Sequence, residues 1–306
     1  KPVMGDTTSR CGSAGEGTVA QRILVIGNCQ APTIADVISR IVADASVETF
    51  LLRLAPRGRD ELAAKLSEFD VVFAQPAEYE KAGPLAFREL QKRHGCVVPY
   101  PAVLFHGFHP DFILGREIGD VRSAALTYHS LIVAAAYSSG IPTNNVGRLF
   151  NPLTFAQLGY YKEYGKSRAF LLSKAKELGY DLSDDFRGWE SGGVFMHTPN
   201  HPAVRVLVSI AARAAQKAGL PVTPDLTEGM DDRLARAVRL PVYPAIAKRL
   251  KVAPNAKFRL QNPQGVRRFD LHEYISTTYE MYRSASPAFF EVPSIRRVAA
   301  VLSELA

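Results

Sequence analysis

The chain has 306 residues, of which 47% are hydrophobic and 22% are charged, a balance typical of a globular protein. No apolar run approaches the roughly 18–20 residues that a membrane span requires, so we expect no transmembrane segment. The three cysteines are widely spaced, which does not favour a disulfide framework and is compatible with a reducing cytoplasm. With no Cys-x-x-Cys pair and no His-Glu-x-x-His run, the sequence predicts no metal site.

Residues 1–21 form a polar tail rich in Gly, Ser and Thr, which we expect to be disordered. The residues before Met4 have the character of a vector remnant, and no secretory signal is visible in the tail. We therefore begin the predicted folded region at Arg22 and expect a cytoplasmic protein.

The region 22–120 alternates between short apolar runs and segments of helical spacing. We predict strands over 23–27, 48–54, 70–76 and within 96–107, with helices over 32–44, 60–69 and 84–93. This alternation is typical of a parallel sheet flanked by helices and places the region in the α/β class.

The region 121–306 is predicted to be mainly helical. The spacing of its apolar residues predicts helices over 122–138, 152–163, 166–178, 201–218, 230–239, 273–284 and 294–305. Only 192–197 has the pattern of a strand. We expect these helices to pack on the sheet, so that both regions can belong to one continuous domain.

The turn Gly27-Asn28-Cys29-Gln30 joins the first predicted strand to the first predicted helix. In an open α/β sheet, ligands bind beyond the carboxyl ends of the strands, where this turn lies. The N–H groups of the helix start would favour an anion or a thiolate at Cys29, and the amides of Asn28 and Gln30 could donate to an oxyanion. The turn therefore suits acyl chemistry or anion binding; the alternative is a small buried cysteine that closes a turn.

A second group of candidates lies in the stretch LFHGFHPDF, residues 104–112. His106 and His109 are three residues apart, and Asp111 follows closely. A histidine with a pKa near neutrality can serve as the general base for a hydroxyl, and a carboxylate at its other ring nitrogen would orient it. The alternative is an ordinary Pro-Asp turn with a structural histidine.

Two further stretches carry polar side chains that could line a pocket. His129 and Ser130 follow Tyr128 at the start of a helix, and Asn200 and His201 precede another helix. A structural role is the alternative for both stretches, since a residue such as Asn200 can also cap a helix.

Basic residues are unevenly distributed. The net charge is +7, and residues 233–269 contain ten Lys or Arg and no Asp or Glu. This segment indicates a phosphorylated cofactor, a nucleotide-sugar, an acidic glycan or a nucleic acid as partner, or else a solvated basic face. Arg53, Arg57 and Arg59 follow the second predicted strand at the same sheet edge as Cys29, where they are candidate phosphate partners.

Three blocks in this order, ILVIGNCQ near the start, LFHGFHPD around residue 108 and MHTPNHP around residue 199, resemble the WcbI family of capsular polysaccharide biosynthesis proteins. The resemblance extends over nearly the whole chain from Arg22. It implies an O-acetyltransferase that uses acetyl-coenzyme A to acetylate a 6-deoxy-heptose unit of a capsule sugar. The implied partners are that glycan acceptor and, by peripheral contact, the capsule assembly machinery, with no nucleic acid.

With the activity that the resemblance implies, the candidate residues fall into a catalytic set and a coenzyme-binding set. The catalytic candidates are Cys29, His106, His109 and Asp111. The candidates for binding coenzyme A are Gly27, Asn28, Gln30, Arg53, Arg57, Arg59, His129, Ser130, Asn200 and His201. Cys29 would either accept the acetyl group covalently or line the pocket beside the thiol of the coenzyme.

The GNC sequence also resembles the Gly-Asp-Ser start of the SGNH hydrolases, with Cys29 at the serine position. The Asp-x-x-His block expected late in those chains is absent, which weakens an esterase assignment. Two alternatives therefore stay open: a hydrolase that cleaves an ester with Cys29 as nucleophile, and a non-catalytic nucleotide- or polyanion-binding module of capsule assembly.

Overall fold

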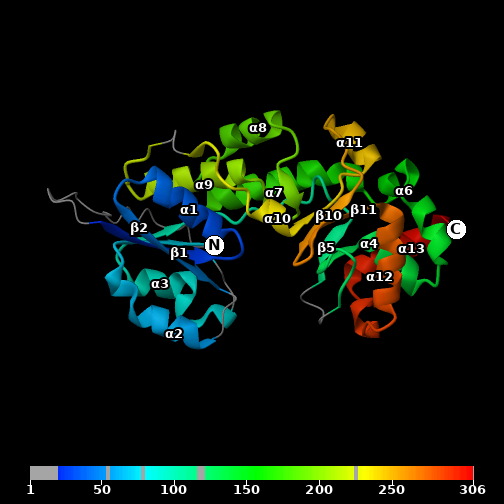
Figure 1. Ribbon diagram of the computed structural model, residues 1–306, viewed down its shortest axis with the longest axis horizontal. Coiled ribbons are helices and arrows are strands. Elements are labelled where there is room, and N and C mark those ends of the chain that lie inside the picture. Colours follow the sequence, from blue (N-terminus) through cyan, green and yellow to red (C-terminus); the bar gives the residue numbers. More distant parts are fainter. Residues whose placement is uncertain (1–19, 53–55, 77–79, 116–120, 224–226, 306) are drawn as a thin grey trace. The chain divides into compact units, whose positions relative to one another are not determined.

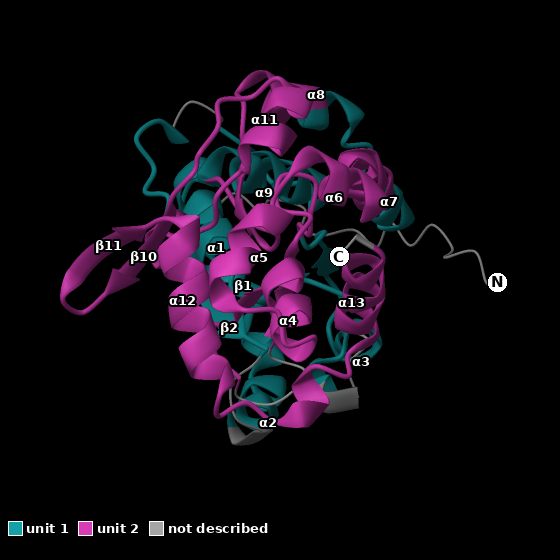
Figure 2. Ribbon diagram, turned by 90° about the vertical axis from the view of Figure 1, so that its right-hand side faces the viewer, with its two compact units in different colours: residues 1–102, 173–186, 204–232 teal, residues 103–172, 187–203, 233–306 magenta. Residues whose placement is uncertain are grey.

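The structure is a computed structural model that describes residues 20–52, 56–76, 80–115, 121–223 and 227–305 (Figure 1). The chain forms two compact units, which are distinguished by colour in Figure 2. Unit 1 comprises residues 1–102, 173–186 and 204–232, and unit 2 comprises residues 103–172, 187–203 and 233–306. None of the described helices has the length and hydropathy that crossing a bilayer requires.

Unit 1 is built on a four-stranded parallel sheet with the strand order β2-β1-β3-β4. Its strands are β1 (Gln21–Gly27), β2 (Ala45–Leu51), β3 (Val71–Ala74) and β4 (Val97–Pro99). Its complete helices are α1 (Ala31–Ile41), α2 (Pro56–Ala64), α3 (Phe87–Arg93) and α9 (Val204–Lys217). The chain leaves β1 toward one edge of the sheet and crosses back from β2 to β3, so the order is that of a doubly wound sheet.

Helices cover both faces of this sheet because the chain adds strands on both sides of β1, first β2 on one side and then β3 and β4 on the other. Right-handed crossovers on either side of β1 place α1 on one face and α2 with α3 on the other, as Figure 1 shows. Leu24 and Ile26 of β1 pack with residues of the α2 and α3 side such as Leu90. On the opposite face α9 packs against α1 and β4. A helix from the second half of the sequence therefore completes the core of the sheet.

Unit 2 combines short antiparallel strands with helices. Its strands are β5 (Phe112–Leu114), β6 (Tyr128–Ser130), β7 (Met196–Thr198), β8 (His201–Pro202), β9 (Val238–Arg239), β10 (Phe258–Asn262) and β11 (Gly265–Phe269). Its complete helices are α4 (Leu131–Ser138), α5 (Thr143–Val146), α6 (Pro152–Gln157), α10 (Leu234–Ala237), α11 (Pro244–Leu250), α12 (Leu271–Tyr282) and α13 (Pro293–Leu305). Helices α7 (Glu163–Glu177) and α8 (Ser183–Ser191) have residues in both units.

Aromatic side chains form much of the core of unit 2. Phe258 stacks between Phe269 and Tyr274, at centroid distances of 5.0 and 4.4 Å. Phe108 and Phe195 meet edge to face at 5.0 Å. Such ring pairs add to the stabilisation that comes from burying the apolar area.

The structure confirms the α/β class, with a parallel sheet flanked by helices and a mainly helical second half. The expected helix over 122–138 begins only at Leu131, because β6 precedes it and Ser130 caps it by accepting a hydrogen bond from the Val133 N–H. The expectation of no strand after 192–197 is wrong, since β9, β10 and β11 form a three-stranded sheet. The units also differ from the expected division near residue 120, because α9 returns to the sheet.

The packing of α9 on α1 leads to a stability prediction. Ile210 lies on the buried face of α9, with 1% of its surface exposed. Ile210→Ala should lower the free energy of unfolding by about 2–5 kcal/mol, because it removes buried methyl groups and leaves a cavity. Hydrogen exchange should show the largest loss of protection in α1, within unit 1, and little change in α4 of unit 2. Gln216→Ala, on the exposed face of the same helix, is the matched control; equal loss of protection in α1 and α4 would contradict the assignment of α9 to unit 1.

Candidate functional site

The sequence-predicted site residues fall into two groups, one in each unit. Unit 1 contains Gly27, Asn28, Cys29, Gln30, Arg53, Arg57 and Arg59. Unit 2 contains His106, His109, Asp111, His129, Ser130, Asn200 and His201.

In unit 1, the side chain of Gln75 holds the turn that follows β1. The Asn28 N–H donates to Oε1 of Gln75 at 2.8 Å, and Nε2 of Gln75 approaches Oε1 of Gln30 at 3.5 Å. Within the turn, the Gln30 N–H donates to Oδ1 of Asn28 at 2.9 Å. Gln75 directly follows β3, so these contacts tie together the ends of β1 and β3, where the strand order reverses. This is where ligands bind in doubly wound sheets.

Gly27 is required by close approach of the neighbouring side chains. A Cβ atom at this position would lie 2.3 Å from the Tyr100 hydroxyl oxygen and 2.8 Å from Oε1 of Gln75. The buried Tyr100 hydroxyl donates to the Ile26 carbonyl at 3.1 Å. Burial, and to a smaller extent the charge of Cys29, raise the pKa of Tyr100 well above its usual value. The turn thus packs tightly against a neutral tyrosine on the side of Cys29.

The N–H groups at the start of α1 were expected to point at a bound anion or thiolate, but they donate to backbone carbonyls of the turn. The Ala31 N–H donates to the Asn28 carbonyl at 3.0 Å, the Thr33 N–H donates to the Gln30 carbonyl at 3.1 Å, and Pro32 has no N–H. These groups are therefore already engaged and do not point at a ligand. The amino group Nδ2 of Asn28 donates to no protein group in the described part of the chain, so it is the donor that this turn offers.

The cysteines differ in state. Cys29 keeps its thiol and is half-buried. Cys96 is disulfide-bonded, a bond that the wide spacing of the cysteines did not suggest.

The three predicted phosphate-binding arginines of unit 1 are only partly described. Arg53 lies outside the described residues, and of Arg57 only the backbone, in α2, is described. Nη2 of Arg59 donates to the carbonyl of Leu52, just beyond the carboxyl end of β2. Arg59 therefore lies at the expected sheet edge, and its phosphate-binding role stays a prediction.

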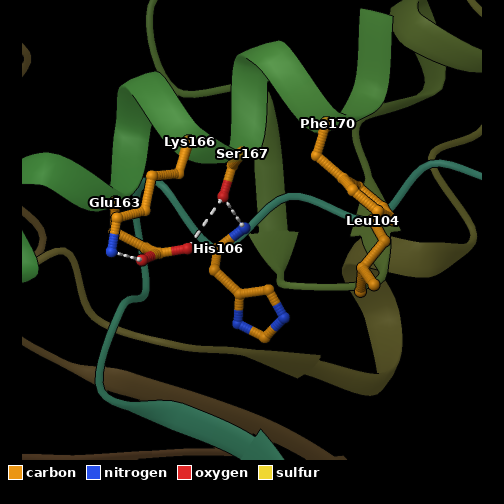
Figure 3. A pocket seen from close by; sticks show the side chains of 6 residues that line it. All are labelled: Leu104, His106, Glu163, Lys166, Ser167 and Phe170. Atoms are coloured by element: carbon orange, nitrogen blue, oxygen red, sulfur yellow. Dashed lines mark hydrogen bonds and ion pairs between the residues drawn. The ribbon is translucent and has the colours of Figure 1, made fainter. Parts of the chain in front are cut away.

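In unit 2, His106 lines a cavity of about 350 Å³ (Figure 3). The other lining residues are Leu104, Glu163, Lys166, Ser167 and Phe170. The His106 N–H donates to Oγ of Ser167 at 3.1 Å, and Figure 3 shows the imidazole extending away from α7. The Ser167 hydroxyl lies 3.4 Å from Oε1 of Glu163, whose other oxygen lies 3.7 Å from Nζ of Lys166.

The charge of Glu163 acts on His106. Burial lowers the pKa of His106 below its usual 6.5, and the neighbouring Glu163 carboxylate partly opposes this effect. His106 is therefore a mainly neutral imidazole near neutral pH, as a general base must be.

His109 is buried, in contrast to His106. Only 1% of its surface is exposed, and neither ring nitrogen has a well-aligned hydrogen-bond partner among the described residues. Burial lowers the pKa of His109 to about 3; the Leu240 backbone opposes this shift, and the adjacent His106 and His197 add to it. His106, His109 and His197 thus form one histidine cluster. Its buried member, His109, is uncharged at neutral pH.

Asp111 does not orient a histidine, although the sequence predicted that role. Its fully buried carboxylate accepts hydrogen bonds from the Ile132 N–H at 3.0 Å, the Tyr160 hydroxyl at 2.8 Å and the Tyr243 hydroxyl at 3.1 Å. Burial raises the pKa of Asp111 to about 6. These hydrogen bonds and one from Ser130 act in the opposite direction and lower it. The carboxylate that acts on a histidine is Glu163, and Asp111 joins three elements of the core.

His129 and Ser130 lie in the interior of unit 2. His129 stacks on Tyr282 with ring centroids 5.7 Å apart, and Nδ1 lies 2.8 Å from the Tyr282 hydroxyl. Burial lowers the pKa of His129 to about 4. The Ser130 N–H donates to the Tyr274 hydroxyl at 3.0 Å. These contacts are those of core residues, and they lend no support to coenzyme binding.

Asn200 and His201 lie at the β7–β8 turn and do not cap a helix, since α9 begins at Val204. Oδ1 of Asn200 accepts hydrogen bonds from the Tyr128 hydroxyl at 2.8 Å and the Thr198 hydroxyl at 3.1 Å. Asn200 is half-buried, so its amino group is placed to serve either the turn or a ligand.

Three residues that shape these sites were missed at the sequence level: Gln75, Tyr100 and Glu163. Gln75 carried a usable signal, because it is a polar residue at the carboxyl end of a buried strand. Tyr100 and Glu163 carried none, since their roles come from side-chain contacts over long sequence separations. Among the described residues, no group of three or more metal-ligating side chains is present.

Comparison with known proteins gives one match. The family model described as "Polysaccharide biosynthesis enzyme WcbI" matches residues 22–223, which include the β1 turn, the histidine cluster and the β7–β8 turn. No curated protein and no solved structure matches the chain.

The role of Gln75 can be tested directly. Gln75→Ala leaves the Asn28 N–H without its acceptor and should cost about 1–2 kcal/mol of unfolding free energy. Because the turn loses its attachment, the rate of Cys29 alkylation, followed by mass spectrometry of its peptide, should change several-fold. Gln91→Ala, at an exposed position of α3, is the control and should leave that rate unchanged. An unchanged rate in both variants would show that Gln75 does not hold the turn.

Proposed function

Since the chain belongs to the WcbI family of polysaccharide biosynthesis enzymes, we propose that it transfers an acetyl group from acetyl-coenzyme A to a hydroxyl of a capsule sugar, a 6-deoxy-heptose unit. The observation that carries the proposal is the Gly27–Gln30 turn, where a cysteine thiol lies between two side-chain amides at the switch point of a doubly wound sheet.

The turn fits the thioester end of this coenzyme. Gly27 keeps the backbone free of a Cβ atom where Tyr100 and Gln75 approach it, and Nδ2 of Asn28 can donate to a carbonyl oxygen that becomes negatively charged. Arg59, at the neighbouring strand end, is a candidate for a phosphate group. Acetyl-coenzyme A supplies the acetyl group as an activated thioester when it is bound.

In unit 2, the cavity of His106 supports an acceptor role. Its volume of about 350 Å³ lies within the range of small-molecule pockets. Glu163, Lys166 and Ser167 provide hydrogen-bonding groups for sugar hydroxyls, and Phe170, which is 51% exposed, provides an apolar face for a sugar ring. A neutral His106 would take the proton from the acceptor hydroxyl.

Two routes are compatible with these residues. In direct transfer the sugar hydroxyl gives its proton to His106 and attacks the acetyl carbonyl. Coenzyme A leaves as a thiolate, which that proton neutralises, and Cys29 takes no covalent part. In a two-step route the Cys29 thiolate attacks the acetyl carbonyl and expels coenzyme A as a thiolate. The sugar hydroxyl then attacks the acetyl-cysteine, gives its proton to the base and releases the Cys29 thiolate. Variants of Cys29 distinguish the two routes.

The proposed activity is tested with the full chain and its Cys29→Ala and Cys29→Ser variants. Calorimetric titration should show binding of coenzyme A and acetyl-coenzyme A, and a heptose acceptor should become acetylated. Near-normal turnover by Cys29→Ala would establish direct transfer, whereas loss of turnover with retained coenzyme binding would establish the two-step route. Release of acetate from a model ester without coenzyme A, or coenzyme binding without transfer to any sugar, would replace the proposal by the hydrolase or the binding module. No binding at millimolar coenzyme A would overturn it.

The role of His106 predicts a pH dependence. Because Glu163 raises the pKa of His106 against burial, Glu163→Gln should lower that pKa and move the acidic limb of kcat/KM to lower pH, by roughly half to one pH unit. The matched control is Glu177→Gln in the same helix, where the carboxylate pairs with Lys174 on the surface. If the acidic limb of kcat/KM does not move in Glu163→Gln, or moves equally in the control, then this limb does not reflect the titration of His106 and His106 is not the general base.

A further inference from the structure

Three arginines lie side by side on one face of the sheet formed by β9, β10 and β11. Arg259 of β10 is directly opposite Arg239 of β9 and directly opposite Arg268 of β11. Residues paired in this way project to the same face, and the strands are about 4.8 Å apart, so the row spans about 10 Å. We call Arg239, Arg259 and Arg268 the arginine row. Figure 2 shows the β10–β11 hairpin projecting from the rest of unit 2.

Within the described residues, no carboxylate neutralises the arginine row. None of its three guanidinium groups forms an ion pair, and residues 233–269 contain no Asp or Glu. Arg267, which points to the other face of β11, does pair with Glu273. Like charges directly opposite each other destabilise a sheet. The unpaired row is therefore a local cost to the fold, in contrast to the paired arginine beside it.

Contacts with α10 hold two of these arginines together. Nη1 of Arg259 donates to the carbonyl of Ala235 at 2.7 Å, and Nε of Arg239 donates to the same carbonyl at 3.2 Å. Two cations thus converge on one neutral oxygen. Burial lowers the pKa of Arg259, and the charges of Arg239 and Arg268 lower it further. Nη2 of Arg259 donates to Oε1 of Gln261 at 3.4 Å. Arg239 and Arg268 are exposed, and among the described residues the Nη groups of Arg239 and the guanidinium of Arg268 donate to no protein group, so these donors are available to a ligand.

The arginine row is linked to the histidine cluster within unit 2. Leu240, which follows Arg239, donates its N–H to the carbonyl of His197 at 2.9 Å, and its backbone also lies against His109. A ligand on the row would therefore have one end near the part of unit 2 that carries the candidate general base.

We propose that Arg239, Arg259 and Arg268 bind the linked phosphate groups of a phosphorylated small molecule that this enzyme uses. A planar guanidinium fork donates two parallel hydrogen bonds to a phosphate, and a diphosphate offers acceptor oxygens on two adjacent phosphorus atoms, which suits a row of forks. Coenzyme A and a sugar carried on a diphosphate both present this chemistry. Both sources rest on the proposed function, in which the coenzyme carries the acetyl donor and the diphosphate-linked sugar would be the acetyl acceptor.

Binding to the full chain is measured by calorimetry with three probes: inorganic pyrophosphate, coenzyme A and uridine diphosphate. Arg268→Gln should weaken pyrophosphate binding roughly tenfold, because one charge-assisted contact is lost, and Arg239→Gln with Arg268→Gln should weaken it further. The matched control is Arg267→Gln, which removes the same charge from the other face of the same strand. A selective loss for coenzyme A identifies the coenzyme as the source, and a selective loss for uridine diphosphate identifies a diphosphate-linked sugar.

A stability measurement separates a binding role from a structural one. Without ligand, Arg268→Gln should have a thermal midpoint equal to or above that of the original chain, because a like-charge contact is relieved. Unchanged affinity for all three probes in the row variants would overturn the proposal, as would equal losses in Arg267→Gln. Binding of heparin or DNA without binding of the small probes would indicate a general polyanion surface and also overturn it. These titrations involve no turnover, so arginine-dependent binding without acetyl transfer would count against the proposed function alone.

Discussion

The hydrogen bond from the Asn28 N–H to the side chain of Gln75 is the contact on which the candidate chemistry of unit 1 depends. It joins the ends of β1 and β3, the two parallel strands between which the strand order reverses. Parallel strands leave their carboxyl ends at one edge, and at a reversal the two following connections diverge to opposite faces. Gln75 binds the backbone N–H of Asn28 and the side chain of Gln30, the residues before and after Cys29. The thiol is therefore presented by a turn whose shape is set from the neighbouring strand, and Gly27 is the residue that allows this close packing.

Unit 2 shows how a polar residue can be essential to a fold without taking part in chemistry. Asp111 brings together donors from η5 (Tyr160–Lys162), from α4 and from the segment before α11, and it carries a raised pKa because it is removed from water. A carboxylate with this many donors is satisfied in place, and losing it would leave several buried donors without an acceptor. Glu163, by contrast, is at the edge of a cavity and acts on His106 through its charge. Depth of burial thus separates the structural carboxylate from the one that can tune a base.

The β1 turn of unit 1 and the arginine row of unit 2 also differ in the charge of their side chains. The β1 turn of unit 1 is held by neutral amides, and its polarity is directed by side chains, since the first N–H groups of α1 are used within the turn. The arginine row of unit 2 is an accumulation of unpaired positive charge that the fold itself does not need. Features that cost stability locally are commonly retained for binding.

The sequence by itself determined the elements of the sheet, the cysteine turn after β1 and the stretch that holds the histidines. Those features are local: apolar runs bounded by Gly and Pro specify strands and turns, and a turn after the first strand of an α/β sheet lies at the ligand-binding edge. Only the tertiary structure decided that α9 completes unit 1, that Asp111 is internal, and that Arg239, Arg259 and Arg268 share a face. These outcomes depend on contacts between residues far apart in sequence, where packing and strand register outweigh local propensity. Arg239 and Arg259 are too far apart in the sequence for helix or strand periodicity to predict that they are neighbours. The pairing of β9 with β10 brings their charges together.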